Sequence, residues 1–175
     1  MIDKFLSYVS DPNGDTYLCA RAAIVDSAQY SPYSNDLTDI ELAVERNDLV
    51  AARRLASESI ANLLLSPGFH LLLSKLAKAE GNATAEKVEL QLAVSCAEGI
   101  LLTGNGTESS PYLVLRMSDE YDILAFLGLE FAGQALVEKD KRHFDCISVR
   151  NGRDLWFDVS DAYQSLQRRM GKRGE

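Results

Sequence analysis

Three residues near the C-terminal end of the chain could bind a metal ion: His143, Asp145 and Asp158. They flank Asn151-Gly152, a dipeptide typical of β-hairpins with a two-residue turn. Such a turn pairs positions whose numbers add up to 303, which sets Asp145 opposite Asp158 and His143 one step further along. Two carboxylates and one imidazole suit a hard or borderline divalent ion, so this pattern predicts a candidate metal site.

The same pairing has a simpler interpretation. Opposed carboxylates cost about 0.2 to 1 kcal/mol unless a cation, a shared proton or a hydrogen-bond donor offsets the repulsion. Two solvated or separately hydrogen-bonded aspartates fit better, because the sequence offers no further carboxylate for this site. A metal-dependent enzyme is therefore a weaker hypothesis than an interaction module or an immunity or antitoxin-like protein. In this register the buried face of the hairpin consists of Phe144, Cys146, Ser148, Leu155, Phe157 and Val159.

The other motifs that could carry chemistry are incomplete. Gly104-x-Gly106 follows a predicted helix and precedes a predicted strand, the reverse of a dinucleotide-binding fingerprint, and no lysine follows it to hold a phosphate. No nucleophile-elbow sequence accompanies His70 or His143. The three cysteines form no CxxC pair, which argues against both a disulfide framework and a zinc site. We therefore expect no catalytic residues and no cofactor.

Residues 34–103 have the three-and-four spacing of apolar residues that predicts amphipathic helices. Four helices are expected, over residues 36–46, 48–65, 69–79 and 83–102. They form two hairpins, because the turn Asn47-Asp48 recurs as Gly81-Asn82 after 34 residues, the period of tetratricopeptide repeats. An unrelated pair of hairpins is the alternative, since no tryptophan opens either repeat. The 83–102 helix is apolar on two sides, and we expect it to be central and covered on both.

Two stacked helical hairpins favour an interaction function, because such repeats commonly present a groove to a peptide or partner protein. By resemblance to tetratricopeptide grooves, the first helix of each hairpin would line it. The expected groove residues are Leu37, Glu41, Val44, Leu71, Lys75 and Lys78. The leading hypothesis is a non-enzymatic protein–protein interaction module.

The rest of the chain mixes short helices and strands. We expect helices over 2–9, 16–29, 118–138 and 161–170, a strand over 112–116, and hairpin strands over 143–150 and 153–159. Tyr121 and Gln134 are polar-tipped residues on the 118–138 helix, which otherwise looks buried, so each should have a hydrogen-bond partner.

The predicted fold is mostly α, within the α+β class. Two tetratricopeptide-like helical hairpins (34–103) are capped by a strand–helix–β-hairpin segment and a short C-terminal helix (104–170). We expect one integrated domain over 1–175, because two repeats alone leave a face uncovered. Residues 171–175 are predicted to be a disordered basic tail.

The formal charge of -8 is unevenly distributed, with +3 after Gln167 and -11 before it. A protein with this much negative charge repels the phosphate backbone of nucleic acids, so we expect no nucleic-acid partner. Neither a signal peptide nor a membrane-spanning stretch is evident, which predicts a cytoplasmic protein that does not bind membranes. The acidity also motivates an alternative function, an immunity or antitoxin-like protein that masks a basic toxin.

Several landmarks in order resemble an uncharacterised bacterial family known as a domain of unknown function. They are Tyr30-Ser31-Pro32-Tyr33, Gly81-Asn82, Gly104-Asn105-Gly106-Thr107, Pro111-Tyr112-Leu113-Val114, Glu120-Tyr121, Leu127-Gly128-Leu129, Gln134-Ala135-Leu136-Val137, Phe144-Asp145 and Trp156-Phe157-Asp158. The resemblance spans nearly the whole chain. It implies a tetratricopeptide-like front half joined to a small α/β end, and it assigns no activity. Asn105 departs from the family's usual Gly-Asp-Gly loop.

Overall fold

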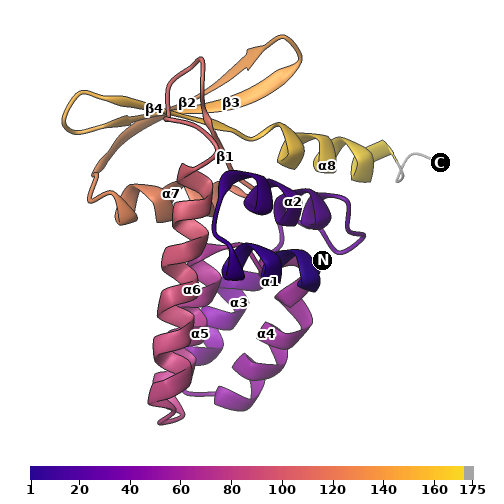
Figure 1. Ribbon diagram of the computed structural model, residues 1–175, viewed down its shortest axis with the longest axis vertical. Helices are drawn as coiled ribbons and strands as arrows, with labels where there is room; N and C mark the ends of the chain where they lie inside the picture. The colour runs from indigo at the N-terminus through magenta and orange to yellow at the C-terminus, as the bar shows by residue number, and fades with distance from the viewer. Residues whose placement is uncertain (172–175) are drawn as a thin grey trace.

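The computed structural model describes residues 1–171, which contain eight helices and one four-stranded sheet (Figure 1). The helices are α1 (Ile2–Ser10), α2 (Gly14–Val25), α3 (Asp36–Glu45), α4 (Leu49–Leu63), α5 (Pro67–Ala79), α6 (Ala83–Leu101), α7 (Met117–Phe126) and α8 (Ser160–Gly171). The strands are β1 (Tyr112–Leu113), β2 (Phe131–Lys139), β3 (Arg142–Val149) and β4 (Asp154–Asp158). The predicted α+β class is confirmed. Of the predicted tail, Gly171 ends α8 and the remainder lies outside the described residues.

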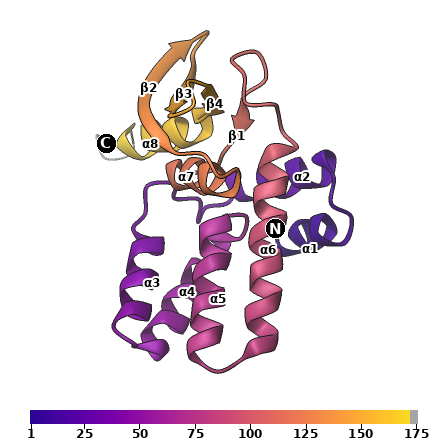
Figure 2. The same ribbon diagram turned by 90° about the vertical axis from the view of Figure 1, so that its left-hand side faces the viewer.

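Helices α3 to α6 stand side by side at one end of the molecule, the sheet lies at the other end, and α7 lies between them (Figure 2). These four helices are the ones predicted for residues 34–103. The two short N-terminal helices, α1 and α2, lie beside the sheet-proximal half of α6 (Figure 1).

The two inter-helix turns that the sequence aligns have the same backbone geometry. Asn47 and Gly81 both have positive φ, 56° and 73°. The next residue in each turn, Asp48 or Asn82, donates its N–H to the carbonyl five positions earlier. Its side chain then accepts the N–H three positions later, which caps the following helix. The 34-residue repetition in the sequence therefore corresponds to two turns of the same construction.

Two clusters of buried side chains form the core. One lies among α3, α4 and α5 and contains Ile40, Ala52, Leu63, Phe69 and Leu76. The other joins α1, α2, α6, α7 and the sheet; its largest fully buried members are Tyr8, Tyr17, Ile24, Leu65, Ile100, Ile123, Ile147 and Phe157. Because α6 and α7 belong to the second cluster, burial of apolar surface connects the helical part to the sheet.

The sheet is mixed, with the strand order β1-β4-β3-β2. β1 pairs with β4 in parallel, and the other neighbours are antiparallel. The strand predicted over 112–116 is shorter in the structure, because only Tyr112 and Leu113 pair. β2 lies at the opposite edge of the sheet.

The helix predicted over 118–138 is wrong in its second half. Gly128 has a φ of 65°, and the N–H of Leu129 donates to the carbonyl of Leu124 at 2.8 Å, an arrangement that ends helices. α7 therefore stops at Phe126, and β2 follows. Asp140 and Lys141 then both have positive φ, 51° and 62°, as a type I′ hairpin turn requires, and lead into β3.

Tyr121 and Gln134 consequently lie on different elements, α7 and β2. The hydroxyl of Tyr121 donates to Oε1 of Gln134 at 2.9 Å, so the expected hydrogen bonds are present. The expectation that both side chains are buried is wrong, because both are exposed.

The hairpin of β3 and β4 is present, but its predicted register is wrong by one residue. Asp145 pairs with Phe157 and Cys146 with Trp156, so paired positions add up to 302. The reason is a three-residue loop in which only Gly152, at φ 82°, is left-handed, whereas the predicted two-residue turn needs two such residues. The slip turns β3 over, so that Asp145, Ile147 and Val149 face the core, whereas Cys146 and Ser148 lie half-buried on the other face. Phe144 also lies on that other face, but it is buried, as predicted. The face of β4 is as predicted, with Leu155, Phe157 and Val159 buried.

Candidate functional site

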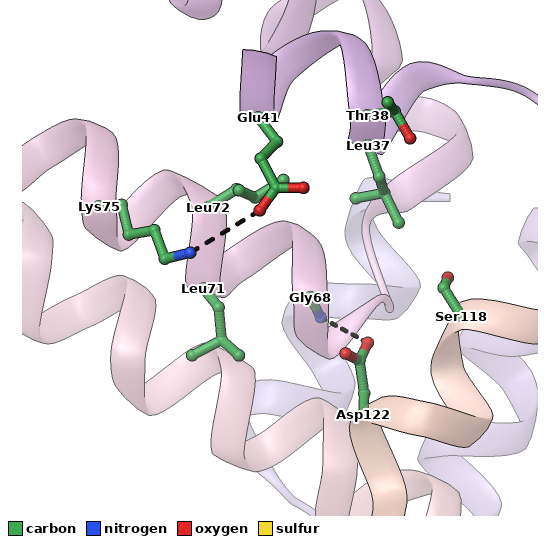
Figure 3. A pocket seen from close by; sticks show the side chains of 9 residues that line it. All are labelled: Leu37, Thr38, Glu41, Gly68, Leu71, Leu72, Lys75, Ser118 and Asp122. Carbon is green, nitrogen blue, oxygen red and sulfur yellow. Dashed lines mark hydrogen bonds and ion pairs between the residues drawn. The ribbon is translucent and has the colours of Figure 1, made fainter. Parts of the chain in front are cut away.

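Four of the six predicted groove residues line one hollow on the surface, which we call the charged hollow (Figure 3). Leu37 and Glu41 come from α3, and Leu71 and Lys75 from α5. The other two lie elsewhere. Val44 packs partly buried against the α3–α5 cluster, and Lys78 is exposed, with Nζ 4.0 Å from Oε1 of Glu86 on α6.

The charged hollow has a volume of about 330 Å³ and is also lined by Thr38, Gly68, Leu72, Ser118 and Asp122. Glu41 and Lys75 point toward each other across it, with Oε1 and Nζ 4.0 Å apart (Figure 3). Both side chains are more than half exposed, so this ion pair contributes little stability and both charges stay accessible.

Asp122 of α7 forms one side of the charged hollow. Its Oδ2 accepts the N–H of Gly68 at 2.8 Å, in the first turn of α5, where backbone N–H groups lack a partner in the helix (Figure 3). A side chain at position 68 would meet this carboxylate, since a Cβ there would lie 2.9 Å from Oδ2. Burial raises the pKa of Asp122 to about 7, and neighbouring Asp119 adds to the rise. Asp122 could not be predicted as a site residue from the sequence, because nothing near it in the chain marks it.

A second hollow of about 310 Å³ adjoins the first, and we call it the apolar hollow. It lies where α7 crosses the α5–α6 pair and is lined by Pro67, Leu71, Leu90, Ala93, Val94, Ala97, Asp122, Ala125 and Phe126. Four large side chains on its walls, Leu71, Leu90, Val94 and Phe126, keep between 37% and 43% of their surface exposed.

The apolar hollow corrects the prediction that both apolar sides of the 83–102 helix are covered. One side of α6, with Cys96 and Ile100, is buried in the core. The other side is only partly covered by the described residues, because Leu90 and Val94 keep 43% and 37% of their surface exposed. Leu71 and Asp122 line both hollows, so the two form one continuous depression beside α5, which we call the α5 groove.

The three candidate metal ligands do not come together. Asp145 faces the core, whereas Asp158 lies on the other face of the sheet, where it pairs with Arg142 and accepts the N–H of Ser160 at 2.9 Å. His143 stacks on Tyr163, with ring centroids 4.3 Å apart. The expected opposition of the two aspartates is wrong. Within residues 1–171, no group of three or more His, Cys, Asp or Glu side chains is placed to hold a metal ion.

The carboxyl group beside Asp145 is Glu120 of α7, and both residues are buried. No N–H or O–H group of the described residues reaches either oxygen of Glu120. Burial, followed by the charge of Asp145, raises the pKa of Glu120 to about 9. This pKa favours the protonated form of Glu120 at neutral pH, in which the carboxyl can donate a hydrogen bond to Asp145. Neither Glu120 nor Asp145 lines the charged hollow or the apolar hollow.

No family model, curated protein or solved structure matches the chain. Over the described residues, no helix combines the length and the apolar character needed to cross a membrane.

Proposed function

We propose that the protein is a non-enzymatic interaction module that binds an apolar segment of a partner protein or peptide in the α5 groove. The observation that carries the proposal is the partly exposed second face of α6. Leu90 and Val94 on this face, with Leu71 of α5 and Phe126 of α7, form an apolar surface around a hollow of about 310 Å³. Contiguous exposed apolar surface with a polar border is typical of protein interaction sites.

The energetics support a macromolecular occupant. Burying apolar surface stabilises a complex by about 25 cal/mol per Å², and these four side chains retain more than a third of their surface for a partner to cover. The floor of the hollow consists of small residues, Ala93 and Ala97 of α6, so large side chains of a partner can enter. Ala93 and Ala97 are themselves buried, which keeps this floor fixed in the free protein.

The charged hollow would orient the bound segment. Glu41 comes from α3 and Lys75 from α5, so a partner with one charge of each sign can pair with both in only one direction. We further propose that α3–α6 are two tetratricopeptide-like hairpins. Two observations support this assignment. The two turns have the same construction, and the first helix of each hairpin supplies the groove residues Leu37, Glu41, Leu71 and Lys75.

The test is capture of the partner by tagged protein from the cells that produce it, followed by comparison of variants. Leu71→Glu and Val94→Glu place a charge in the apolar hollow and should reduce capture at least tenfold, because each charge loses its water on binding. Val50→Glu is the matched control, since Val50 is 84% exposed on α4 and lines neither hollow. Equal capture by all three variants would exclude the groove.

The charged hollow is tested separately by reversing its charges. Glu41→Lys and Lys75→Glu should each weaken the captured complex. If neither does, the partner does not use this hollow. A captured protein that is a basic toxin would favour the immunity or antitoxin-like alternative over a scaffold.

A further inference from the structure

Strand β2 has a free edge. Within residues 1–171 its only strand neighbour is β3, and most of its residues are exposed. The register with β3 shifts between Phe131 and Gly133, and residues 133–139 then pair with β3 without interruption. Leu136, in the middle of this regular segment, is 51% exposed.

The hydrogen bonds of β3 determine which backbone groups of β2 point outward. Val149 donates to Arg153, and Val159 donates to His143, so the odd-numbered residues of β3 bond to β4. In an antiparallel ladder this direction alternates, so the even-numbered residues of β3 bond to the odd-numbered residues of β2. The N–H and C=O groups of Gln134, Leu136 and Glu138 therefore point toward the free edge.

This edge lacks most of the features that prevent strands from associating. The regular segment contains no proline and no bulge, and its charges are confined to its C-terminal end, at Glu138 and Lys139. A long exposed edge of this kind is a template for another strand.

We propose that β2 pairs with β2 of a second copy of the chain, antiparallel, about a two-fold axis at Leu136. This register pairs the whole regular segment 133–139 with itself. Leu136 then meets its own copy, Ala135 faces Val137, and Gln134 faces Glu138, whose carboxylate can accept a hydrogen bond from the amide. Moving the axis to Gln134 would oppose Glu130 to Glu138, and moving it to Glu138 would oppose that residue to itself.

The residues at the two ends of segment 133–139 are also compatible with this pairing. Lys139 faces Gly133, and a Cβ at Gly133 would have no heavy atom within 4 Å in the free protein. The Lys139 side chain therefore has space to keep its ion pair with Glu108, whose Oε1 lies 2.7 Å from Nζ. At the opposite edge of the sheet β1 has only two residues, so assembly ends at a dimer with one eight-stranded sheet.

Sedimentation equilibrium at increasing chain concentration tests the proposal. The wild-type protein should form a dimer that dissociates on dilution. Gln134→Glu sets two pairs of glutamates opposite each other and should raise the dimer Kd by roughly twofold to thirtyfold. It keeps the acceptor that Tyr121 uses, so the monomer should fold as before. Gln134→Lys should lower the Kd by a similar factor.

The double variant Gln134→Glu/Glu138→Gln is the matched control, because it restores one amide and one carboxylate at each crossing and should return the Kd to the wild-type value. Leu136→Pro removes an outward N–H and should abolish the dimer without unfolding the monomer, which the far-UV circular dichroism spectrum checks. A wild-type protein that is monomeric at about 0.5 mM overturns the proposal. So does a dimer whose Kd neither Gln134→Glu nor Leu136→Pro changes.

Discussion

The guanidinium of Arg116 donates hydrogen bonds to both the backbone carbonyl and Oδ1 of Asn62, at 2.6 and 3.0 Å, although 54 positions separate the two residues. Both side chains are buried. The amide of Asn62 also holds the segment before α3, accepting the N–H of Ser31 at 2.9 Å and donating to Asp36 at 2.8 Å. One asparagine of α4 therefore joins three parts of the chain, including the start of α7.

Asn62→Ala should reduce the free energy of unfolding by about 2 to 4 kcal/mol, because it leaves the buried Arg116 guanidinium without its acceptor side chain. Urea unfolding measures the change. Asn35→Ala is the matched control, since Asn35 is exposed and its side chain makes no cap hydrogen bond. A loss of less than 1 kcal/mol at Asn62 would contradict the role assigned to this network.

The carboxyl of Glu120 should make stability fall with rising pH. Its pKa is about 9 in the folded protein against 4.5 as a free side chain, so between these values the folded state binds more protons than the unfolded state. Stability is then lost as the pH rises from 4.5 toward 9. Asp122, with a pKa of about 7, adds a similar loss that is complete above pH 7.

Glu120→Gln removes the ionisation and keeps a hydrogen-bond donor for Asp145. Its free energy of unfolding should decline less than that of the wild type between about pH 7 and pH 9. In this range Glu120 of the folded wild type is still losing its proton, whereas Asp122 has already lost its own. Urea titrations at four pH values would show the difference. Parallel curves for the two proteins would mean that Glu120 does not hold its proton in the folded state.

Gly99→Ala should destabilise the protein by about 2 to 3 kcal/mol, although alanine is favoured over glycine inside a helix by about 1 kcal/mol. A Cβ at position 99 would lie 2.2 Å from the ring of Tyr17 and 2.7 Å from the hydroxyl of Tyr8. The sign of the change in melting temperature is decisive. A rise would show that α1 and α2 do not pack on α6 as closely as described.

Magnesium, manganese, calcium and zinc should each leave the melting temperature unchanged, because Asp145 and Asp158 face opposite sides of the sheet. Asp158→Asn should still lower stability by about 1 kcal/mol, since it weakens the pairing with Arg142. Asp140→Asn, at an exposed turn position that asparagine also tolerates, serves as the control. A metal-induced shift that disappears in Asp158→Asn would restore the metal hypothesis.

The helical part could be predicted from the sequence because its signals are local. The apolar spacing and the repeated turns Asn47-Asp48 and Gly81-Asn82 are sufficient to locate α3–α6. β2 was missed because Ala132 and Leu136 also fit a helical face. The decisive feature is the positive φ of Gly128, which composition does not reveal. The register of the β3–β4 hairpin was predicted wrongly because its loop has three residues, one more than the predicted turn. Asp122 and the open face of α6 could not be foreseen, because they depend on where α7 crosses the α5–α6 pair.

Only residues 127–130 separate the groove wall at Phe126 from the free strand that begins at Phe131, and hydrogen bonds from Gly128 and Leu129 back to α7 fix this connection. A dimer formed through β2 would consequently hold two α5 grooves in a constant mutual orientation. A partner that carries two copies of the bound segment at the matching spacing would engage both at once, and the second contact would form at the effective concentration set by its own linker. Avidity, rather than the affinity of a single groove, would then govern how long such a complex persists.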